Sequence, residues 1–259
     1  MVCLFIRQVV LNSPVPESSY LSRLPVVRFL QKHELNFSSP VTFLVGENGT
    51  GKSTLLEAIA VACGFNPEGG TRNFSFSTND THSPLYESIT LTRQGYPKDG
   101  FFLRAESYYN TANYIEEIYR SELFSGSNTP YGNRSLHQQS HGEGFLTLIG
   151  ERFRGEGLYL LDEPESALSP ANQLTLIALI HRLVQQGAQF IIATHSPMLM
   201  TYPGAQLYQL SQSGIEEVPY TQTEHYRLTR QFLNDPEYIL KYLLTEDSGV
   251  PRELDGEKR

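Results

Sequence analysis

Residues 46–54, Gly-Glu-Asn-Gly-Thr-Gly-Lys-Ser-Thr, constrain the fold of this chain more than any other segment. They fit the pattern G-x-x-x-x-G-K-[ST]. The apolar, β-branched run 41–45 before them predicts a buried strand, and the composition of residues 53–62 after them predicts a helix. Glycines let a loop turn its backbone N–H groups inward, and a helix begins with a positive end. This strand, loop and helix therefore predict a phosphate-binding site.

We expect every residue of this loop to contact a bound nucleotide or to shape the site for it. The Lys52 ammonium would neutralise the outer phosphates, and the Ser53 hydroxyl would ligate Mg²⁺. A glycine-rich turn that matches the pattern by chance is the alternative, and the strand and helix that flank the loop disfavour it. The expected nucleotide-binding residues of the loop are Gly46, Glu47, Asn48, Gly49, Thr50, Gly51, Lys52, Ser53 and Thr54.

Two adjacent acids, Asp162 and Glu163, follow a second apolar run at 158–161. Carboxylates that end a strand of a parallel sheet lie at the edge where such sheets bind ligands. We expect Asp162 to hold Mg²⁺, usually through water, as the acid at this position does in P-loop enzymes. Successive strand residues alternate in direction, so Glu163 is expected to reach the attacking water instead. The alternative is an acidic turn that caps the next helix, which fits Glu165 better than this pair.

The remaining pattern predicts an α/β fold. A third apolar run at 189–193 and a helical spacing of apolar residues over 172–186 follow the segments already described. Strands that alternate with helices and are apolar throughout favour a mostly parallel sheet with helices on both faces. Hairpins are expected at 88–104 and 205–218, and two short helices within 223–244.

Composition limits the class of protein. The formal net charge of −8 and the pI of about 5.4 weigh against a protein that coats nucleic acid by itself, although a local basic patch is compatible with them. Two cysteines, Cys3 and Cys63, form no disulfide framework and indicate a reducing compartment. No apolar run approaches the roughly 20 residues of a membrane span. We therefore expect no transmembrane segment and a cytoplasmic location.

A further segment, taken with these motifs, resembles the ABC-type P-loop ATPases. Ser140-His141-Gly142-Glu143 precedes a helical stretch and is similar to a variant of that family's signature, Leu-Ser-Gly-Gly-Gln. Ser140 and Gly142 match its serine and second glycine, whereas Gln139 and His141 depart from it. Glu143 in the last position is closer to the SMC- and RecF-like branch, which serves DNA repair and chromosome maintenance, than to most transporters.

The resemblance implies an ATP-dependent homodimer. A hydroxyl and backbone N–H groups at a helix start form a second phosphate-binding end. In the family fold this end is too far from the phosphate loop of its own subunit, so Ser140, Gly142 and Glu143 would contact the ATP held by another copy. Two chains would then enclose two Mg·ATP head to tail and separate after hydrolysis.

Two more segments follow in the family's order. Residues 166–169, Ser-Ala-Leu-Ser, are similar to the family's D-loop, with Ser169 where aspartate is common. Residues 194–196, Thr-His-Ser, follow the third apolar run as the family's switch histidine does. Alone, His195 would more readily be a structural histidine, but the resemblance gives it the role of binding the γ-phosphate and sensing its loss. The expected catalytic residues are Lys52, Glu163 and His195.

Two further residues of the family pattern have no clear counterpart in this chain. The family's glutamine, which touches Mg²⁺ and water after the middle strand, is absent from residues 101–106. Glu106 is the expected substitute and thus a metal ligand beside Ser53 and Asp162, with Gln94 as a poorer candidate. The aromatic residue that stacks on adenine is not evident. Tyr20 and Phe37 are candidates, and each is explained at least as well as a core or loop aromatic.

We expect one ABC-type domain over residues 1–245, with a helical insertion at about 105–150. A charged tail at 246–259, whose composition allows disorder, would follow it. The expected fold class is α/β, of the ABC ATPase type, with a mostly parallel sheet flanked by helices and an antiparallel β portion. The chain has no sustained heptads, which excludes an ATPase with long coiled-coil arms.

Three functions are compatible with these residues. The first is a soluble, ATP-driven switch that acts with an unidentified protein partner in nucleic-acid maintenance or defence, with nucleic acid as a candidate ligand. The second is the nucleotide-binding subunit of an ABC membrane transporter. The third is an ATP-dependent scaffold without hydrolysis, against which Glu163 and His195 both argue. ATP and Mg²⁺ are the expected ligands in the first two cases, and ATP in the third.

Overall fold

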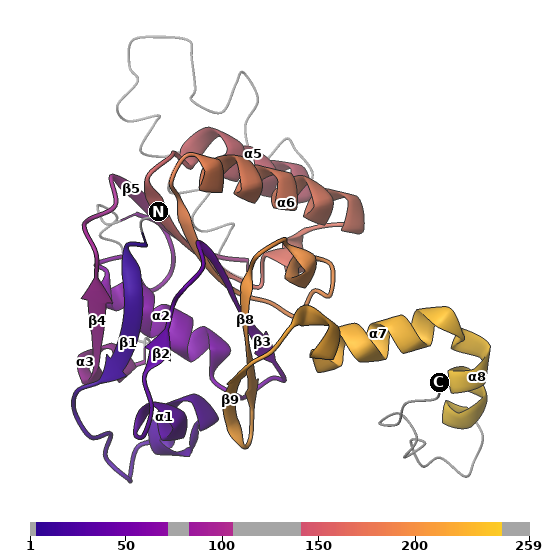
Figure 1. Cartoon of the computed structure of the whole chain (residues 1–259), viewed down its shortest axis with the longest axis horizontal. Coiled ribbons are helices and arrows are strands. Elements are labelled where there is room, and N and C mark those ends of the chain that lie inside the picture. Colours follow the sequence, from indigo (N-terminus) through magenta and orange to yellow (C-terminus); the bar gives the residue numbers. More distant parts are fainter. Residues whose placement is uncertain (1–3, 72–82, 106–140, 245–259) are drawn as a thin grey trace.

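The structure, a computed structural model, describes residues 4–71, 83–105 and 141–244. Two sheets and the helices packed on them form one body, from which the two C-terminal helices extend (Figure 1). The larger sheet is mostly parallel and the smaller one is antiparallel. This arrangement confirms the expected α/β fold class of the ABC ATPase type.

The six strands of the larger sheet are β3 (Val41–Gly46), β5 (Asp99–Arg104), β6 (Gly157–Asp162), β7 (Gln189–Ala193), β8 (Gln206–Ser211) and β9 (Gly214–Glu217). They lie in the order β5-β6-β7-β3-β8-β9, and only β9 runs antiparallel to its neighbour. β3 therefore lies inside the sheet, between β7 and β8. Every residue of β3, β6 and β7 is buried.

Helices cover both faces of this sheet. α2 (Lys52–Ala62) packs on one face, and α5 (His141–Arg152) and α6 (Pro170–Gln185) lie side by side on the other (Figure 1). Successive side chains of β3 point to opposite faces of the sheet. Leu44 belongs to the core under α2, whereas Phe43 and Val45 belong to the core under α5 and α6. Burial on both faces explains why these strands read as unbroken apolar runs.

The smaller sheet consists of β1 (Ile6–Leu11), β2 (Leu35–Asn36) and β4 (Ile89–Arg93) in the order β2-β1-β4. One buried side chain ties it to the larger sheet. The Gln189 amide of β7 donates from Nε2 to the carbonyl of Ile6 and accepts at Oε1 from the N–H of Ile6, both at 2.9 Å. The amide satisfies two backbone groups of β1 that lie away from water.

The expected hairpin at 88–104 is wrong in its pairing, although both strands exist. β4 pairs with β1, and β5 pairs in parallel with β6. The reason is burial, because Phe101 and Phe102 are fully buried and point to opposite cores, which requires a helical layer on each side. The hairpin expected at 205–218 is confirmed by β8 and β9.

The chain closes with α7 (Glu224–Asn234) and α8 (Pro236–Leu243), as expected. They follow η5 (Tyr220–Gln222), and Thr223 at the start of α7 is fully buried. The Thr223 hydroxyl donates to the Tyr220 carbonyl at 2.7 Å, and it lies 3.7 Å from the sulfur of Met200. The start of α7 is therefore fixed to the body, and its far end is not (Figure 1).

The remaining short helices connect these elements. They are η1 (Tyr20–Arg23), α1 (Pro25–Leu30), α3 (Leu85–Ser88), η3 (Pro164–Ala167) and η4 (Leu199–Thr201). Within the described ranges, no helix combines the length and the apolar character that a membrane span requires. Most of the insertion expected at 105–150, and the tail at 246–259, lie outside the described residues, so the expected division of the chain stays a prediction.

Candidate functional site

The loop between β3 and α2 needs its glycines because neighbouring atoms leave no room for side chains. Gly46 and Gly51 have φ angles of 138° and 98°, a region that other residues rarely adopt. A Cβ at Gly46 would lie 2.1 Å from the carbonyl oxygen of Leu210, and one at Gly51 would lie 2.4 Å from Val26 Cγ1. The loop is thus held between β8 and α1.

Lys52, the first residue of α2, lies folded over this loop. Its side chain is almost fully buried, and Nζ donates to the carbonyl oxygens of Gly46 at 2.7 Å and Glu47 at 3.0 Å. Burial lowers the pKa of Lys52, and the carboxylates of Glu163 and Asp162 oppose that shift. No side chain caps the start of α2, so the helix end is left for an anion. The expected phosphate-binding elements occur together here.

Ser53 and Asp162 form the candidate metal site. The Ser53 hydroxyl donates to Oδ1 of Asp162 at 2.9 Å, and Asp162 is buried at the end of β6. A hydroxyl and a carboxylate are oxygen donors of the kind that Mg²⁺ takes, and Mg²⁺ commonly adds water and substrate phosphate to one or two protein ligands. The donor set therefore fits. The described ranges contain no group of three or more His, Cys, Asp or Glu side chains that could hold a metal ion.

Sequence reasoning missed Arg104, which ends β5 directly opposite Asp162. Its Nε lies 3.4 Å from Oδ2 of Asp162, and its Nη1 donates to Oε2 of Glu57 at 2.8 Å. A cation thus lies beside the candidate metal ligand. A correct prediction that β5 pairs in parallel with β6 would have placed Arg104 opposite Asp162. A hairpin was expected at 88–104 instead, so this pairing was not predicted.

The substitutes expected for the family's glutamine are not supported by described contacts. Glu106 lies outside the described residues. Gln94 is exposed and follows β4, where its backbone N–H donates to the Phe5 carbonyl at 3.1 Å. It extends the smaller sheet rather than the end of β5, so the proposal for Gln94 is wrong.

Glu163 leaves the line of β6 through an unusual backbone conformation. Its φ and ψ are 49° and 50°, and among the described non-glycine residues only Glu156 also has a positive φ. The Glu163 N–H donates to the carbonyl of Ala193 at 2.9 Å, which anchors the turn to the end of β7. Such a conformation costs about 1–3 kcal/mol and is often found at functional sites. Asp162 and Glu163 were expected to differ in direction through strand alternation, but Glu163 lies outside β6 and takes this left-handed conformation instead. Their separate roles stay a prediction.

His195 follows β7 and lies beside Glu163. Its Nε2 is 3.4 Å from Oε1 of Glu163, and its backbone N–H donates to Oε1 of Glu165 at 2.5 Å. Burial lowers the pKa of His195, the ammonium of Lys52 and the adjacent imidazole of His225 lower it further, and Glu163 opposes the shift. Burial also raises the pKa of the Glu165 carboxyl. The lowered pKa of His195 favours its neutral imidazole at neutral pH.

A second histidine, His225, contacts the first and was not foreseen. It is the second residue of α7, and its Nε2 lies 2.9 Å from Nδ1 of His195. Burial lowers the pKa of His225, and Lys52 adds to the shift. The chain separates the two histidines by 30 residues, and nothing in the local pattern around His225 singles it out.

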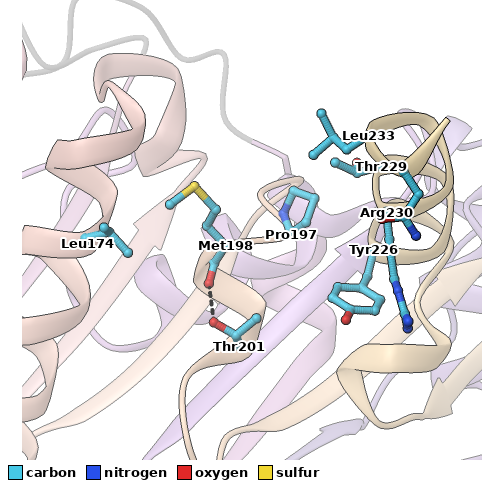
Figure 2. A pocket seen from close by; sticks show the side chains of 9 residues that line it. Leu174, Pro197, Met198, Thr201, Tyr226, Thr229, Arg230 and Leu233 are labelled. Atoms are coloured by element: carbon cyan, nitrogen blue, oxygen red, sulfur yellow. Dashed lines mark hydrogen bonds between the residues drawn. The ribbon is translucent and has the colours of Figure 1, made fainter. Parts of the chain in front are cut away.

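An apolar groove of about 370 Å³ adjoins the histidine pair. One wall consists of residues shortly after His195 and one residue of α6, and the other wall is α7 (Figure 2). The lining residues are Leu174, Pro197, Met198, Thr201, Tyr226, Thr229, Arg230, Leu233 and Asn234. The histidines therefore meet where the two walls of the groove begin.

The start of α5, which was matched to the family's signature, lies against residues of the segment matched to the D-loop and the first turn of α6. α5 begins at His141, and a Cβ at Gly142 would lie 2.7 Å from Nδ2 of Asn172 and 3.1 Å from the carbonyl oxygen of Ala167. Glu143, in the first turn, is exposed. Ser140 lies outside the described residues. A glycine at 142 thus permits a close approach between α5 and the segment that follows Glu163.

The two aromatic candidates for adenine stacking differ in exposure. Phe37 is a buried member of the core, with 4% of its surface exposed, so its role in adenine stacking is excluded. Tyr20 is 58% exposed and remains a prediction. Ser169 has a local role, because its hydroxyl accepts from the N–H of Asn172 at 3.3 Å and caps α6.

Two family models match the chain. Residues 26–140 match a family described as "AAA domain", and residues 128–201 match one described as "AAA domain, putative AbiEii toxin, Type IV TA system".

Curated relatives match over most of the chain. The chain is 29% identical over 205 residues to "Cobalt import ATP-binding protein CbiO" of Salmonella paratyphi A, a match that covers 74% of each protein. It is 26% identical over 182 residues to "ABC transporter G family member STR2" of Medicago truncatula. That match covers 64% of this chain and only 25% of the plant protein, so the chain corresponds to about a quarter of that relative.

A solved structure resembles the fold. The structure "An inward-facing conformation of a putative metal-chelate type ABC transporter" superposes with a TM-score of 0.50 over 89% of this chain and 90% of that one. At 18% identity the likeness concerns the fold alone.

Proposed function

We propose that this chain, an ABC-type P-loop ATPase, binds ATP together with Mg²⁺ and hydrolyses it between two head-to-tail copies of itself. The observation that carries the proposal is the convergence of three elements at one edge of the sheet. Lys52 and Ser53 start α2, Asp162 ends β6 and is followed by Glu163, and His195 lies shortly after β7. Direct contacts join Ser53 to Asp162 and Glu163 to His195.

Each residue has one task in this scheme. Lys52, buried at the centre of the loop, offsets the negative charge of the outer phosphates. Ser53 and Asp162 would hold Mg²⁺, which when bound supplies further positive charge to the phosphate oxygens. Phosphoryl transfer depends mainly on positioning and electrostatic stabilisation. Lys52, Ser53 and Asp162 would therefore supply most of the electrostatic stabilisation of the bound phosphates.

Glu163 and His195 act on the reacting atoms. The Glu163 carboxylate accepts a hydrogen bond from the attacking water and holds it in line with the γ-phosphate. The neutral His195 imidazole donates from Nε2 to a γ-phosphate oxygen. Their 3.4 Å contact supports a shared role at the γ-phosphate. We propose that the other copy contributes Ser140, Gly142 and Glu143 to the same nucleotide.

The packing of Gly142 supports this role of the second copy. The start of α5 approaches the carbonyl of Ala167, four residues after Glu163. A nucleotide bound at the start of α5 therefore lies next to the D-loop of that same chain. Dimer closure and placement of the catalytic carboxylate would be coupled through this contact.

The substitution Glu163→Gln tests the proposal. The wild type should hydrolyse ATP and stay largely monomeric, whereas the variant should bind ATP and form a dimer that dissociates when Mg·ATP is removed. Mass in solution, measured with and without Mg·ATP, reports the dimer. A variant that binds ATP and remains monomeric would overturn the head-to-tail assembly, and a wild type without ATPase activity would overturn hydrolysis.

For the biological role we place the nucleotide-binding subunit of a membrane transporter first. The curated relatives above carry transporter names, which favours this role over the nucleic-acid role that sequence reasoning put first. The chain should then sediment with membranes of its native cells and, after detergent extraction, remain with an integral membrane protein. Complete recovery in the soluble fraction, for both wild type and Glu163→Gln with ATP, would contradict the role.

A role in nucleic-acid maintenance or defence is the second candidate. Glu143 in the signature favours it, as does the description of the family matched by residues 128–201, which mentions a toxin–antitoxin system. In the same fractionation, an association that nuclease treatment abolishes would support this candidate and contradict the first.

A further inference from the structure

We propose that His225 is a positioning residue for His195, and that its Nε2–H donates to Nδ1 of His195 so that the single proton of His195 stays on Nε2. In this tautomer His195 presents an N–H toward Glu163 and the γ-phosphate site. The inference rests on the proposed function, because the γ-phosphate is the acceptor that gives this tautomer its purpose.

The contacts of His195 define the tautomer. Nε2 lies 3.4 Å from a carboxylate oxygen of Glu163, and a carboxylate can only accept, so Nε2 is the atom that carries the proton. At this distance the pair is not a well-formed hydrogen bond. Within the described part of the chain, Nε2 is a buried atom without a hydrogen-bond partner. It is a donor directed at the site where phosphate and water are proposed to lie.

The contact with His225 follows from this assignment. A neutral imidazole has one donor and one acceptor, so a His195 protonated on Nε2 accepts at Nδ1. The Nε2 of His225 is 2.9 Å from that atom and must therefore donate. The opposite tautomer of His195 would turn a lone pair toward the Glu163 carboxylate and toward a phosphate oxygen, which is repulsive in both cases.

Burial, together with the positive charge of Lys52, favours the neutral form of both rings, and the nearby carboxylates oppose it. Lys52 faces both histidines, Glu163 faces His195, and Glu224 and Glu47 face His225. His225 also lies in the first turn of α7, where the positive helix end opposes a charged imidazole. Two neutral rings permit one directed N–H···N bond, whereas two charged rings would present a donor to a donor.

The position of His225 is fixed by its neighbour in the chain. Thr223, fully buried, holds the start of α7 to η5 and lies against Met200 of η4, the short helix that follows the His195 loop. Beyond this point α7 is separated from the residues after His195 by the apolar groove (Figure 2). The histidine pair is therefore a polar contact between the segment before Pro197 and the start of α7, next to the two walls of the groove.

Two substitutions at His225 separate positioning from structure. His225→Leu removes the donor, and His225→Gln retains an amide N–H close to the place of Nε2. We expect His225→Leu to lower kcat by about 10-fold or more, the usual cost of losing the group that orients a functional histidine, with KM for ATP changed less than 2-fold. His225→Gln should recover kcat to within about 3-fold of the wild type. A merely structural role predicts equal losses in both variants.

The tautomer can also be read without turnover. Long-range ¹H–¹⁵N correlation spectra distinguish the two imidazole tautomers, and His195→Gln identifies the signals of His195. We expect His195 in the nucleotide-free wild type to be protonated on Nε2 alone, and His225→Leu to show a mixture. A wild-type His195 protonated on Nδ1, or a His225→Leu spectrum identical to the wild type, would overturn the inference.

The kinetic results distinguish this inference from the proposed function. If the wild type hydrolyses ATP, His195→Gln is impaired and His225→Leu is fully active, only the positioning role fails. If the wild type shows no ATP hydrolysis that depends on Lys52, the proposed function is wrong. The inference about His225, which rests on it, is then wrong as well.

Discussion

The Ser53 hydroxyl donates to Oδ1 of Asp162 across 2.9 Å, although 109 residues separate them in the chain. Asp162 ends β6, whereas Ser53 lies in the first turn of α2, which follows β3. Because β7 lies between β6 and β3 in the sheet, the bond joins segments that are not neighbours. The two oxygens that would hold Mg²⁺ are therefore assembled by the fold itself. Binding the metal would replace the Ser53–Asp162 hydrogen bond, while Arg104 lies beside the other oxygen of Asp162.

Ser53→Ala should raise the Mg²⁺ concentration for half-maximal ATPase activity by about 10-fold or more, because the metal loses a protein ligand. Ser53→Thr retains the hydroxyl and should stay near the wild type. ATPase rates measured over a range of Mg²⁺ concentrations at saturating ATP give the comparison. An unchanged Mg²⁺ dependence in Ser53→Ala would remove this residue from the site.

Gly142→Ala should separate the start of α5 from the D-loop, since the added methyl would lie 2.7 Å from Nδ2 of Asn172. We expect a loss of about 1–3 kcal/mol in the free energy of unfolding. ATP binding should be retained, whereas the ATP-dependent dimer of the Glu163→Gln background should be lost. Gly150→Ala, in the same helix with nothing within 4 Å of the new methyl, is the matched control. It should be neutral or more stable by up to about 1 kcal/mol. Equal behaviour of the two variants would contradict the argument.

Local patterns predicted the elements of the phosphate site because each element is determined by nearby residues. The apolar runs at 41–45, 158–161 and 189–193 are strands because both faces are buried, and the glycine loop is fixed by steric limits at Gly46 and Gly51. These elements converge because parallel strands end at a common edge. Most of the proposed nucleotide site could therefore be predicted from sequence alone.

What the sequence could not show depends on pairing and packing between distant segments. Arg104 lies beside Asp162 only because β5 pairs in parallel with β6, and adjacent β strands with a glycine-rich turn favour a hairpin by local rules. His225 meets His195 at the start of α7, where Thr223 lies against Met200 of the body. Neither relationship has a spacing that a pattern could detect.

Arg104→Met should destabilise the nucleotide-free protein, because Glu57 and Asp162 both lose a cation while their side chains are only 12% and 6% exposed. The expected loss is about 2 kcal/mol in the free energy of unfolding, which chemical denaturation measures. Glu57→Gln should cost less in the Arg104→Met background than in the wild type, by about 1 kcal/mol, because the pair is already broken. Strictly additive losses would mean that the contact carries no coupling energy.

Gln189→Leu should weaken the junction of the two sheets. The substitution leaves the N–H and the carbonyl of Ile6 without the partners that now lie at 2.9 Å. Two buried, unsatisfied backbone groups predict a loss of about 2–4 kcal/mol, measured by urea unfolding. Gln185→Leu, at an exposed position of α6, is the control and should change stability by less than about 0.5 kcal/mol. A loss no larger than that of the control would show that water satisfies Ile6.

The histidine pair predicts how stability depends on pH. Burial and the charge of Lys52 lower the pKa of His195 and of His225 below their ordinary value of about 6.5, which applies in the unfolded chain. As the pH falls below 6.5, the unfolded chain binds protons that the folded chain does not, so stability is full above this pH and declines below it. Glu163, Glu224 and Glu47 oppose the shifts and reduce the effect.

His225→Gln removes one of the two groups and should flatten this decline. Unfolding free energies measured at pH 7.5, 6.5 and 5.5 should therefore show the wild type losing more stability than the variant as the pH falls. Groups that titrate in both proteins, such as Glu165, cancel in the difference. Parallel curves would mean that His225 binds its proton equally in the folded and unfolded chains. A steeper decline in the variant would mean that folding raises the pKa of His225 in the wild type. The histidine pair would then be charged rather than neutral.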